Sequence, residues 1–146
     1  MAEFALRDIA PPPGQDGLVD RAFLAELEMH LGAGLTAEIL ADAKLALADR
    51  LLASRDATHD RPRLMKYAHD LVGLAGQVGL HALSHAARQV EQAAYARDPA
   101  RLDQALARMG QVGEASLVAL SALPASLAPL SPPAPMRAPP RRGEPS

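Results

Sequence analysis

The chain of 146 residues contains no cysteine and no tryptophan, and aromatic residues make up only 3% of it. The absence of cysteine excludes disulfides, thiolate catalysis and cysteine-ligated zinc. Runs of valine, isoleucine, threonine and tyrosine, which favour strands, are also missing, whereas alanine and leucine are abundant. The composition therefore predicts a single all-α domain.

The chain also lacks a strong net charge and a long apolar run. Its formal net charge of −2 gives no basic stripe for nucleic acid. The first residues, MAEFALRDIAPPP, lack the basic start and apolar core of a signal peptide. Residues 71–87 carry no charged side chain, but their histidines, glutamine and glycines make them too polar to span a membrane. We therefore expect a cytoplasmic protein with no nucleic-acid and no membrane partner.

Proline distinguishes both ends of the chain from its middle. Residues 1–17 are predicted to form a flexible leader, and residues 123–146 a disordered proline-rich tail to which no activity is assigned. Residues 18–122 between them are interpreted as one helical domain.

Apolar residues at helical spacing predict five helices in this domain, at about 20–31, 36–51, 60–79, 80–97 and 98–120. Thr36 is a plausible N-cap of the second helix, Asp60 of the third and Asp98 of the fifth. Because the connections are short, we expect an antiparallel up-down four-helix bundle with the additional short N-terminal helix lying across one end.

The third predicted helix has a regular apolar face. Its seam follows the 4-3-4-3 spacing of a bundle and consists of Leu64, Ala68, Leu71, Ala75 and Val78, with Tyr67 and Leu74 extending the buried arc. His69 falls roughly 140° away from this seam at about 100° per residue, so its side chain is expected to point to solvent.

Three glycines follow His69 on the same predicted helix, although an interior glycine costs about 1 kcal/mol relative to alanine. Gly73 and Gly76 lie one and two turns beyond His69 and away from the seam. We interpret them as removing side chains from around the imidazole, so that another molecule can come close. Gly79 is predicted only to break the chain between the third and fourth helices.

The residues beside His69 suggest a landing site for a partner. Met65 and Val72 flank it as an apolar rim; the alternative is that they are residues at the edge of the core. Lys66, Asp70 and Gln77 lie on the other side.

An exposed imidazole is nucleophilic near neutral pH and can accept a phosphoryl group on a ring nitrogen. Such a transfer depends mainly on positioning and charge neutralisation, which a partner carrying Mg²⁺ and an aspartate could supply.

These residues resemble the histidine phosphotransfer (HPt) domains of multistep two-component phosphorelays. The family motif is His-x-Leu-Lys-Gly-x-(Ala/Ser)-(Gly/Ala)-x-x-Gly on a helix of a four-helix bundle. It stands here as His69, Leu71, Gly73, Ala75, Gly76 and Gly79. The similarity extends over about residues 18–122, because FLAELEMHLGAGLTAEIL and LSHAARQVEQAA resemble the family's early and post-motif helices.

The resemblance implies that His69 is the phosphoacceptor and that Gly73 makes room for the phosphoryl group. It further implies that the partners are receiver domains of a hybrid histidine kinase and a response regulator. Mg²⁺ would then be supplied by the receiver, with no cofactor or metal bound by this chain. We expect no independent kinase or hydrolase activity, and we favour a monomer.

One position departs from the family pattern. The residue three after the histidine is usually lysine or arginine and helps to neutralise phosphate, but here it is Val72. Lys66 or Arg88 could substitute, and Glu91 could orient the imidazole while repelling a bound phosphoryl group. Gly76 is assigned to the same supporting group, and Met65, Val72 and Gln77 to partner docking.

Val72 also leaves open a second hypothesis, a binding module that regulates a histidine kinase or receiver by docking without being phosphorylated. His69 could also be an ordinary surface histidine, although the neighbouring glycines argue against this. His81 and His85 have a spacing compatible with one metal, but no third ligand is evident, so we predict solvent-exposed polar residues there.

Overall fold

The computed structural model describes residues 17–124 and residue 127 of the chain. The described part is all-helical and contains five helices and no strand, which confirms the predicted fold class. The helices are α2 (Arg21–Leu31), α3 (Ala33–Asp56), α4 (Arg61–Gln77), α5 (His81–Ala96) and α6 (Pro99–Ser121). The predicted leader and most of the predicted tail lie outside the described residues.

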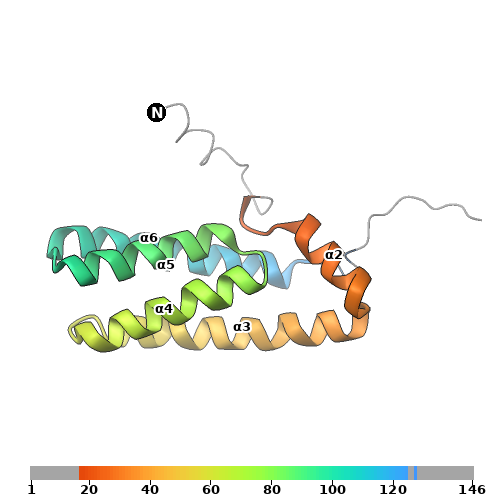
Figure 1. Ribbon diagram of the computed structural model, residues 1–146, viewed down its shortest axis with the longest axis horizontal. Coiled ribbons are helices and arrows are strands. Elements are labelled where there is room, and N and C mark those ends of the chain that lie inside the picture. The colour runs from red at the N-terminus through yellow and green to blue at the C-terminus, as the bar shows by residue number, and fades with distance from the viewer. Residues whose placement is uncertain (1–16, 125–126, 128–146) are drawn as a thin grey trace, which may run out of the picture.

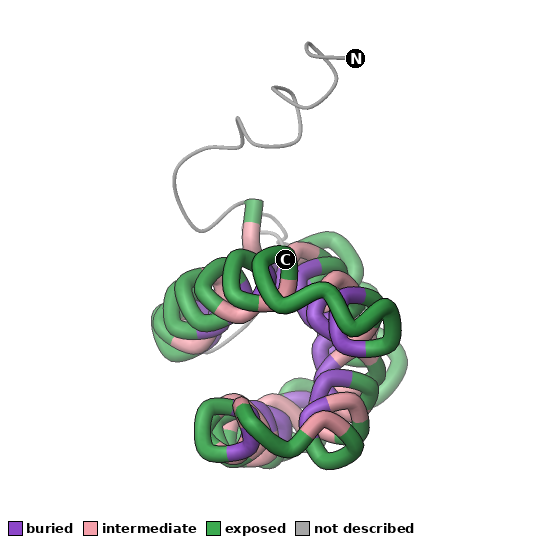
Figure 2. The backbone as a smooth tube through the Cα atoms, turned by 90° about the vertical axis from the view of Figure 1, so that its left-hand side faces the viewer, coloured by how far each residue is buried: buried purple, intermediate pink, exposed green. Residues whose placement is uncertain are grey.

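The four longer helices lie side by side along the molecule, and α2 lies across one end of them (Figure 1). Helix α4 contacts α3 and α5, and α6 contacts α5 and, less extensively, α3. The end view in Figure 2 shows the buried residues on the inner sides of these helices. This arrangement is compatible with the predicted four-helix bundle.

Three helices begin at an aspartate whose carboxylate caps the first turn. Asp20 accepts a hydrogen bond from the backbone N–H of Phe23 at 3.0 Å, Asp60 from Arg63 at 3.3 Å, and Asp98 from Arg101 at 3.2 Å. Capping by aspartate satisfies N–H groups that have no partner inside the helix. Two of these caps, at residues 60 and 98, were predicted from the sequence.

The prediction for the start of the second helix was wrong. Helix α3 begins at Ala33, and Thr36 is buried in its first turn without a hydrogen-bond partner for its hydroxyl among the described residues. The chain turns at Gly32, which has a φ of +90° that glycine adopts without strain. Because this single residue completes the turn, residues 33–35 can already be helical.

The predicted seam of α4 forms the centre of the core. Leu64, Ala68, Leu71 and Ala75 are fully buried, and Val78 just beyond the helix is 2% exposed. Helix α5 presents a matching face of small and branched residues: Leu83, Ala86, Ala87, Val90, Ala93 and Ala94. Small side chains allow α4 and α5 to pack closely along their length.

Gly79 ends the α4 region and also anchors α2. Its carbonyl accepts a hydrogen bond from the N–H of Asp20 at 2.9 Å. Its φ is +75°, and a Cβ at this position would lie 3.2 Å from side-chain atoms of both Asp20 and Phe23. Asp20 also bonds to Nε2 of His81 at 3.0 Å. Glycine is therefore needed here both for the turn and for the close approach of α2.

Candidate functional site

His69 lies in the middle of α4 and points to solvent, as its spacing from the seam predicts. Its side chain is 75% exposed, whereas its chain neighbours Ala68 and Asp70 are buried and half-buried. An imidazole in this position is accessible to a second molecule without any movement of the chain.

Glu91 on α5 holds one nitrogen of the His69 ring. The distance from Nδ1 of His69 to Oε2 of Glu91 is 3.1 Å, and the Glu91 side chain is 30% exposed. A carboxylate accepts this hydrogen bond, so Nδ1 carries the proton, and in the neutral imidazole Nε2 keeps its lone pair. Nε2 makes no hydrogen bond among the described residues, and it is the ring nitrogen available for reaction.

Gly73 leaves open space on the surface of α4 near His69. A Cβ built at Gly73 would have no other atom within 4 Å, so packing does not require glycine there. Gly73 is exposed, and its missing side chain opens the surface one turn beyond His69. This agrees with its predicted place on the outer face.

Gly76 lies elsewhere than predicted. It is half-buried against α5, where an added Cβ would lie 3.8 Å from Oγ of Ser84. The Ser84 hydroxyl donates a hydrogen bond to the carbonyl of Val72 at 2.9 Å. Gly76 therefore belongs to the contact between α4 and α5, contrary to the expectation that neither glycine faces a packing partner.

Lys66 is turned toward a carboxylate of its own helix. Its Nζ lies 3.4 Å from Oδ2 of Asp70, and the same oxygen accepts a hydrogen bond from Nε of Arg50 on α3 at 3.1 Å. This hydrogen bond to Asp70 raises the pKa of the Arg50 guanidinium above its ordinary value. The two cations thus neutralise Asp70, the residue directly after His69.

Arg88 is the other cation that the sequence assigned to the site. It is exposed on α5, four residues after Ser84 and three before Glu91, both of which contact α4. Residues at these spacings share a helix face. Among the described residues Arg88 forms no ion pair, so its charge is available beside the open surface at Gly73.

The three predicted docking residues on α4 differ in exposure. Met65 and Val72 are half-buried, and Gln77 is exposed. Met65 and Val72 are thus partly core and partly surface. Their exposure agrees both with a docking rim and with the edge of the core.

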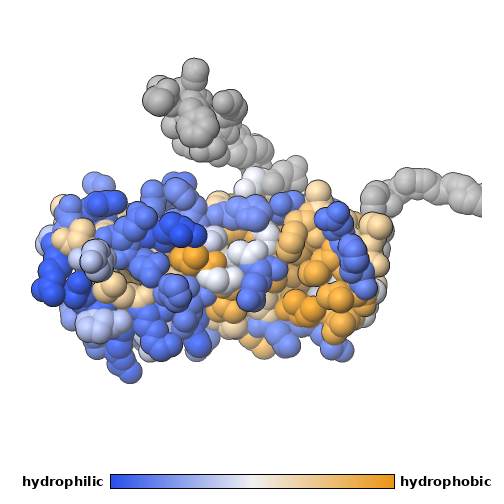
Figure 3. Space-filling model, viewed as in Figure 1, coloured by the Kyte–Doolittle hydropathy of each residue, from blue (hydrophilic) through white to orange (hydrophobic). Residues whose placement is uncertain are grey.

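The face formed by α4 and α5 has two unlike halves. Hydrophilic side chains cover the end farthest from α2, and hydrophobic side chains gather over α2 and the adjoining part of the bundle (Figure 3). Exposed hydrophobic residues of α2 and the start of α3 are Phe23, Met29, Leu31 and Leu35. The sequence interpretation gave these four residues no part in docking.

The remaining histidines do not form a second site. His81 and His85 are both exposed, as predicted, and His81 is used in the contact with Asp20. Among the described residues no group of three or more potential ligands is placed to hold a metal ion. No helix in this part of the chain is long and apolar enough to cross a membrane.

Arg50 and Ser84 are the contributors to the site's surroundings that sequence analysis missed. Lys66 and Asp70 have an i, i+4 spacing that predicts their pairing. The approach of Arg50, twenty residues earlier in the chain, depends on how α3 packs against α4, and no local pattern indicates it.

Comparison with known proteins assigns the chain to a family. The family model for the Hpt domain matches residues 21–123, which includes all five described helices up to the end of α6. The chain belongs to the Hpt domain family. No curated protein and no solved structure matches it significantly. Membership connects the chain with histidine phosphotransfer in two-component signalling, in which Hpt domains interact with receiver domains.

Proposed function

We propose that the chain is a phosphorelay intermediate in which Nε2 of His69 accepts a phosphoryl group from a receiver aspartate and passes it to another receiver. The exposed imidazole, whose Nδ1 is held by Glu91 at 3.1 Å, is the observation that carries the proposal. The donor would be the receiver of a hybrid histidine kinase, and the acceptor that of a response regulator.

The transfer exchanges one bond to phosphorus for another. The lone pair of Nε2 attacks the phosphorus of the aspartyl phosphate, the N–P bond forms, and the bond from phosphorus to the aspartate oxygen breaks. The electron pair of that bond returns to the receiver as a carboxylate. The proton on Nδ1 stays in place, and the positive charge that develops on the ring is stabilised by the Glu91 carboxylate. The reverse sequence passes the group to the second receiver.

Charge neutralisation is proposed to come from both partners. Mg²⁺ bound by the receiver offsets charge on the phosphoryl oxygens, as metal ions do in phosphoryl transfer generally. Arg88 supplies a cation from this chain in place of the residue that Val72 replaces. Lys66 is the weaker candidate, because Asp70 already engages it.

Docking is proposed to use the surface around His69. Met65, Val72 and Gln77 form its near rim, and Gly73 lets the receiver's phosphorylated loop approach the α4 backbone. The exposed apolar residues of α2 extend this surface, since exposed apolar patches commonly mark protein interfaces.

The direct test is incubation with radiolabelled phosphorylated receivers from the same genome. We expect label to move to an acid-labile histidine in the wild-type chain, and no label in His69→Gln. His85→Gln is the matched control, because His85 is exposed but lies outside the site. The proposal is wrong if no receiver transfers to the wild-type chain, or if the His69→Gln variant is labelled equally.

A non-phosphorylated docking module is the second candidate, favoured by Val72 in the place of the usual cation. Signalling by variant strains of cells that depend on the protein distinguishes the two functions. The relay predicts that His69→Gln and Gly73→Arg strains both fail. The docking module predicts normal signalling by His69→Gln and failure of Gly73→Arg alone.

A further inference from the structure

A groove runs between α3 and α6, on the side of the bundle opposite the face that carries His69. Of the four contacts between neighbouring helices of the bundle, the one between α3 and α6 is the least extensive, and Figure 2 shows the two helices well separated. Two cavities lie along the groove. The larger, about 460 Å³, is lined by apolar side chains including Leu51, Leu52, Leu106, Met109 and Leu117. The smaller, about 180 Å³, lies near α2 and is lined by residues that include Ala33, Thr36 and Leu120.

The outward face of α3, beside the groove, has an alternating acidic and apolar stripe. On α3 its members follow 3-4-3-4 spacing and are Asp42, Leu45, Asp49, Leu52 and Asp56, all of them exposed. Leu45 is 73% exposed and Leu52 is 58% exposed, even though Leu52 lines the larger cavity. An apolar face that no other described element covers is a typical docking surface.

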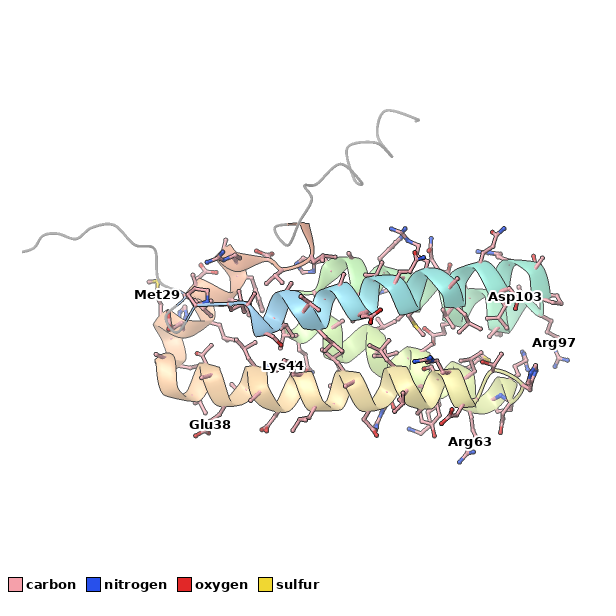
Figure 4. All side chains as sticks on the ribbon, turned by 180° about the vertical axis from the view of Figure 1, so that it is seen from behind. Met29, Glu38, Lys44, Arg63, Arg97 and Asp103 are labelled. Carbon is pink, nitrogen blue, oxygen red and sulfur yellow. The ribbon has the colours of Figure 1, made fainter. Side chains whose placement is uncertain are left out.

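The charged side chains that line the groove balance one another. Glu114 from α6 and Arg55 from α3 line the larger cavity on opposite sides, and Glu28 and Lys44 line the smaller one. Lys44 points from α3 toward α6, where its Nζ donates to Oγ of Ser121 at 3.2 Å (Figure 4). A mainly apolar occupant therefore suits the two cavities.

The chain itself arrives at one end of the groove. After α6, the residues Leu123, Pro124 and Leu127 line the smaller cavity. The N–H of Leu127 donates to Oε1 of Glu28 at 2.9 Å. Residues 128–146 follow this anchored position and contain seven prolines, two larger apolar residues (Leu130 and Met136) and three arginines (Arg137, Arg141 and Arg142) against a single acidic residue, Glu144.

We propose that residues 128–146 bind along the α3–α6 groove, with the side chain of Met136 in the larger cavity. The length of tail between Leu127 and Met136 agrees with the distance between the two cavities along α3. At about 3.1 Å per residue for an extended proline-rich chain, Met136 lies about 28 Å beyond Leu127. At about 1.5 Å per residue, Leu52 lies about 29 Å along α3 from Ala33, which lines the cavity where Leu127 sits.

The tail is a better occupant than a second copy of the chain. A second copy docked in the same groove would meet Leu123, Pro124 and Leu127 at its near end, whereas residues 128–146 continue directly from them. Proline restricts the unbound segment, which lowers the entropy lost on binding. The groove lies away from His69, so occupation by the tail leaves the phosphotransfer face uncovered.

The absence of cysteine allows a direct test in the full-length chain. Ala138→Cys introduces the only thiol, to which a nitroxide spin label is attached, and amide signals are recorded in a ¹⁵N-labelled sample. We expect loss of most of the signal intensity for residues around Leu52, Met109 and Gly110, and none around Gly73 and Arg88.

Two variants of the labelled chain make the result specific. Leu52→Asp should abolish the loss by placing a charge in the cavity. Tyr95→Asp is the control and should leave the loss unchanged, because Tyr95 is also exposed, at 73% against 58% for Leu52, but lies on α5.

A mixed sample identifies the occupant. Spin-labelled chain without ¹⁵N is added to ¹⁵N-labelled chain without the spin label. Signal loss that appears equally in this mixture would show that the groove binds a second molecule, and it would overturn the proposal. Loss that is uniform over the whole domain, that falls on another face, or that survives Leu52→Asp would overturn it as well.

Discussion

Gly73 lowers the stability of α4 and leaves His69 accessible to a partner. A Cβ at this position meets no other atom, and the residue lies inside an exposed helix, where glycine costs about 1 kcal/mol relative to alanine. No packing interaction compensates for this cost. The benefit is the open surface beside His69, which a receiver needs in order to bring its aspartyl phosphate close.

Substitutions of Gly73 should therefore affect stability and transfer in opposite directions. We expect Gly73→Ala to raise the free energy of unfolding by about 1 kcal/mol in chemical denaturation. Gly73→Arg should leave the fold intact and slow phosphotransfer by about 100-fold or more, because displacing reacting groups by about 1 Å already costs that much. Rapid transfer by Gly73→Arg would contradict the place we assign to the receiver.

Glu91 acts on the reaction through the His69 ring. Glu91→Ala removes the acceptor at 3.1 Å from Nδ1, and we expect transfer to slow about fivefold, corresponding to roughly 1 kcal/mol for one partly exposed hydrogen bond. Glu91→Gln keeps an oxygen that accepts from Nδ1 and should retain most of the rate. Single-turnover kinetics with a phosphorylated receiver measure both variants. Equal rates for wild type and Glu91→Ala would exclude a positioning role.

Among the elements, α2 depends on a few polar contacts at its first residue. Asp20 caps the helix, bonds to Gly79 through its N–H and contacts His81. The hydrogen bond from the Phe23 N–H, followed by that of His81, holds the pKa of Asp20 below its ordinary value. A carboxyl whose pKa is lower in the folded state stabilises the fold above its unfolded pKa. That contribution is lost as the pH falls through the folded pKa.

We therefore expect Asp20→Ala to lower the free energy of unfolding by about 1 kcal/mol at pH 7. The difference from wild type should shrink as the pH falls below about 4, where an unfolded aspartate becomes protonated. Urea titrations at a series of pH values measure it. Asp103→Ala is the control, because Asp103 is exposed on α6 and forms no ion pair among the described residues. A difference that persists unchanged into acid would rule out the carboxylate as its source.

The elements also show what the sequence can predict. Helix α4 was predictable because its seam repeats regularly and Asp60 and Pro62 mark its start. The start of α3 was not, because Thr36 is a good capping residue in isolation, and only the positive φ of Gly32 makes a cap at residue 36 unnecessary. The exposure of His69 followed from helical geometry alone. The place of Gly76 and the partner of Asp70 depend on how neighbouring helices pack, which periodicity within one helix does not encode.

At the scale of the whole molecule, the two long faces of the bundle differ in their use. The face of α4 and α5 carries His69, Glu91 and Gly73, and these helices are packed tightly by small residues. The opposite face, between α3 and α6, leaves the groove. A rigid α4–α5 pair fixes the imidazole and its partner relative to each other, which phosphoryl transfer requires.

The core should support the site without taking part in its chemistry. Leu71 is fully buried two residues from His69, and Leu71→Ala should destabilise the fold by about 2–5 kcal/mol. At temperatures where the variant remains folded, we expect its transfer rate per folded molecule to stay within about twofold of wild type, since a change this small is under about 0.5 kcal/mol in the barrier. Thermal unfolding and transfer assays on the same samples separate the two effects. A large loss of rate in fully folded protein would implicate the core in positioning the imidazole.

The most direct measurement is NMR of the histidine rings in ¹⁵N-labelled protein, recorded during phosphorylation by a receiver. We predict that a single ring, that of His69, acquires a bond from phosphorus to Nε2 while its Nδ1 keeps a proton. Phosphorus on Nδ1 of His69, or on the ring of any other histidine, would contradict the assignment of the relay to this nitrogen.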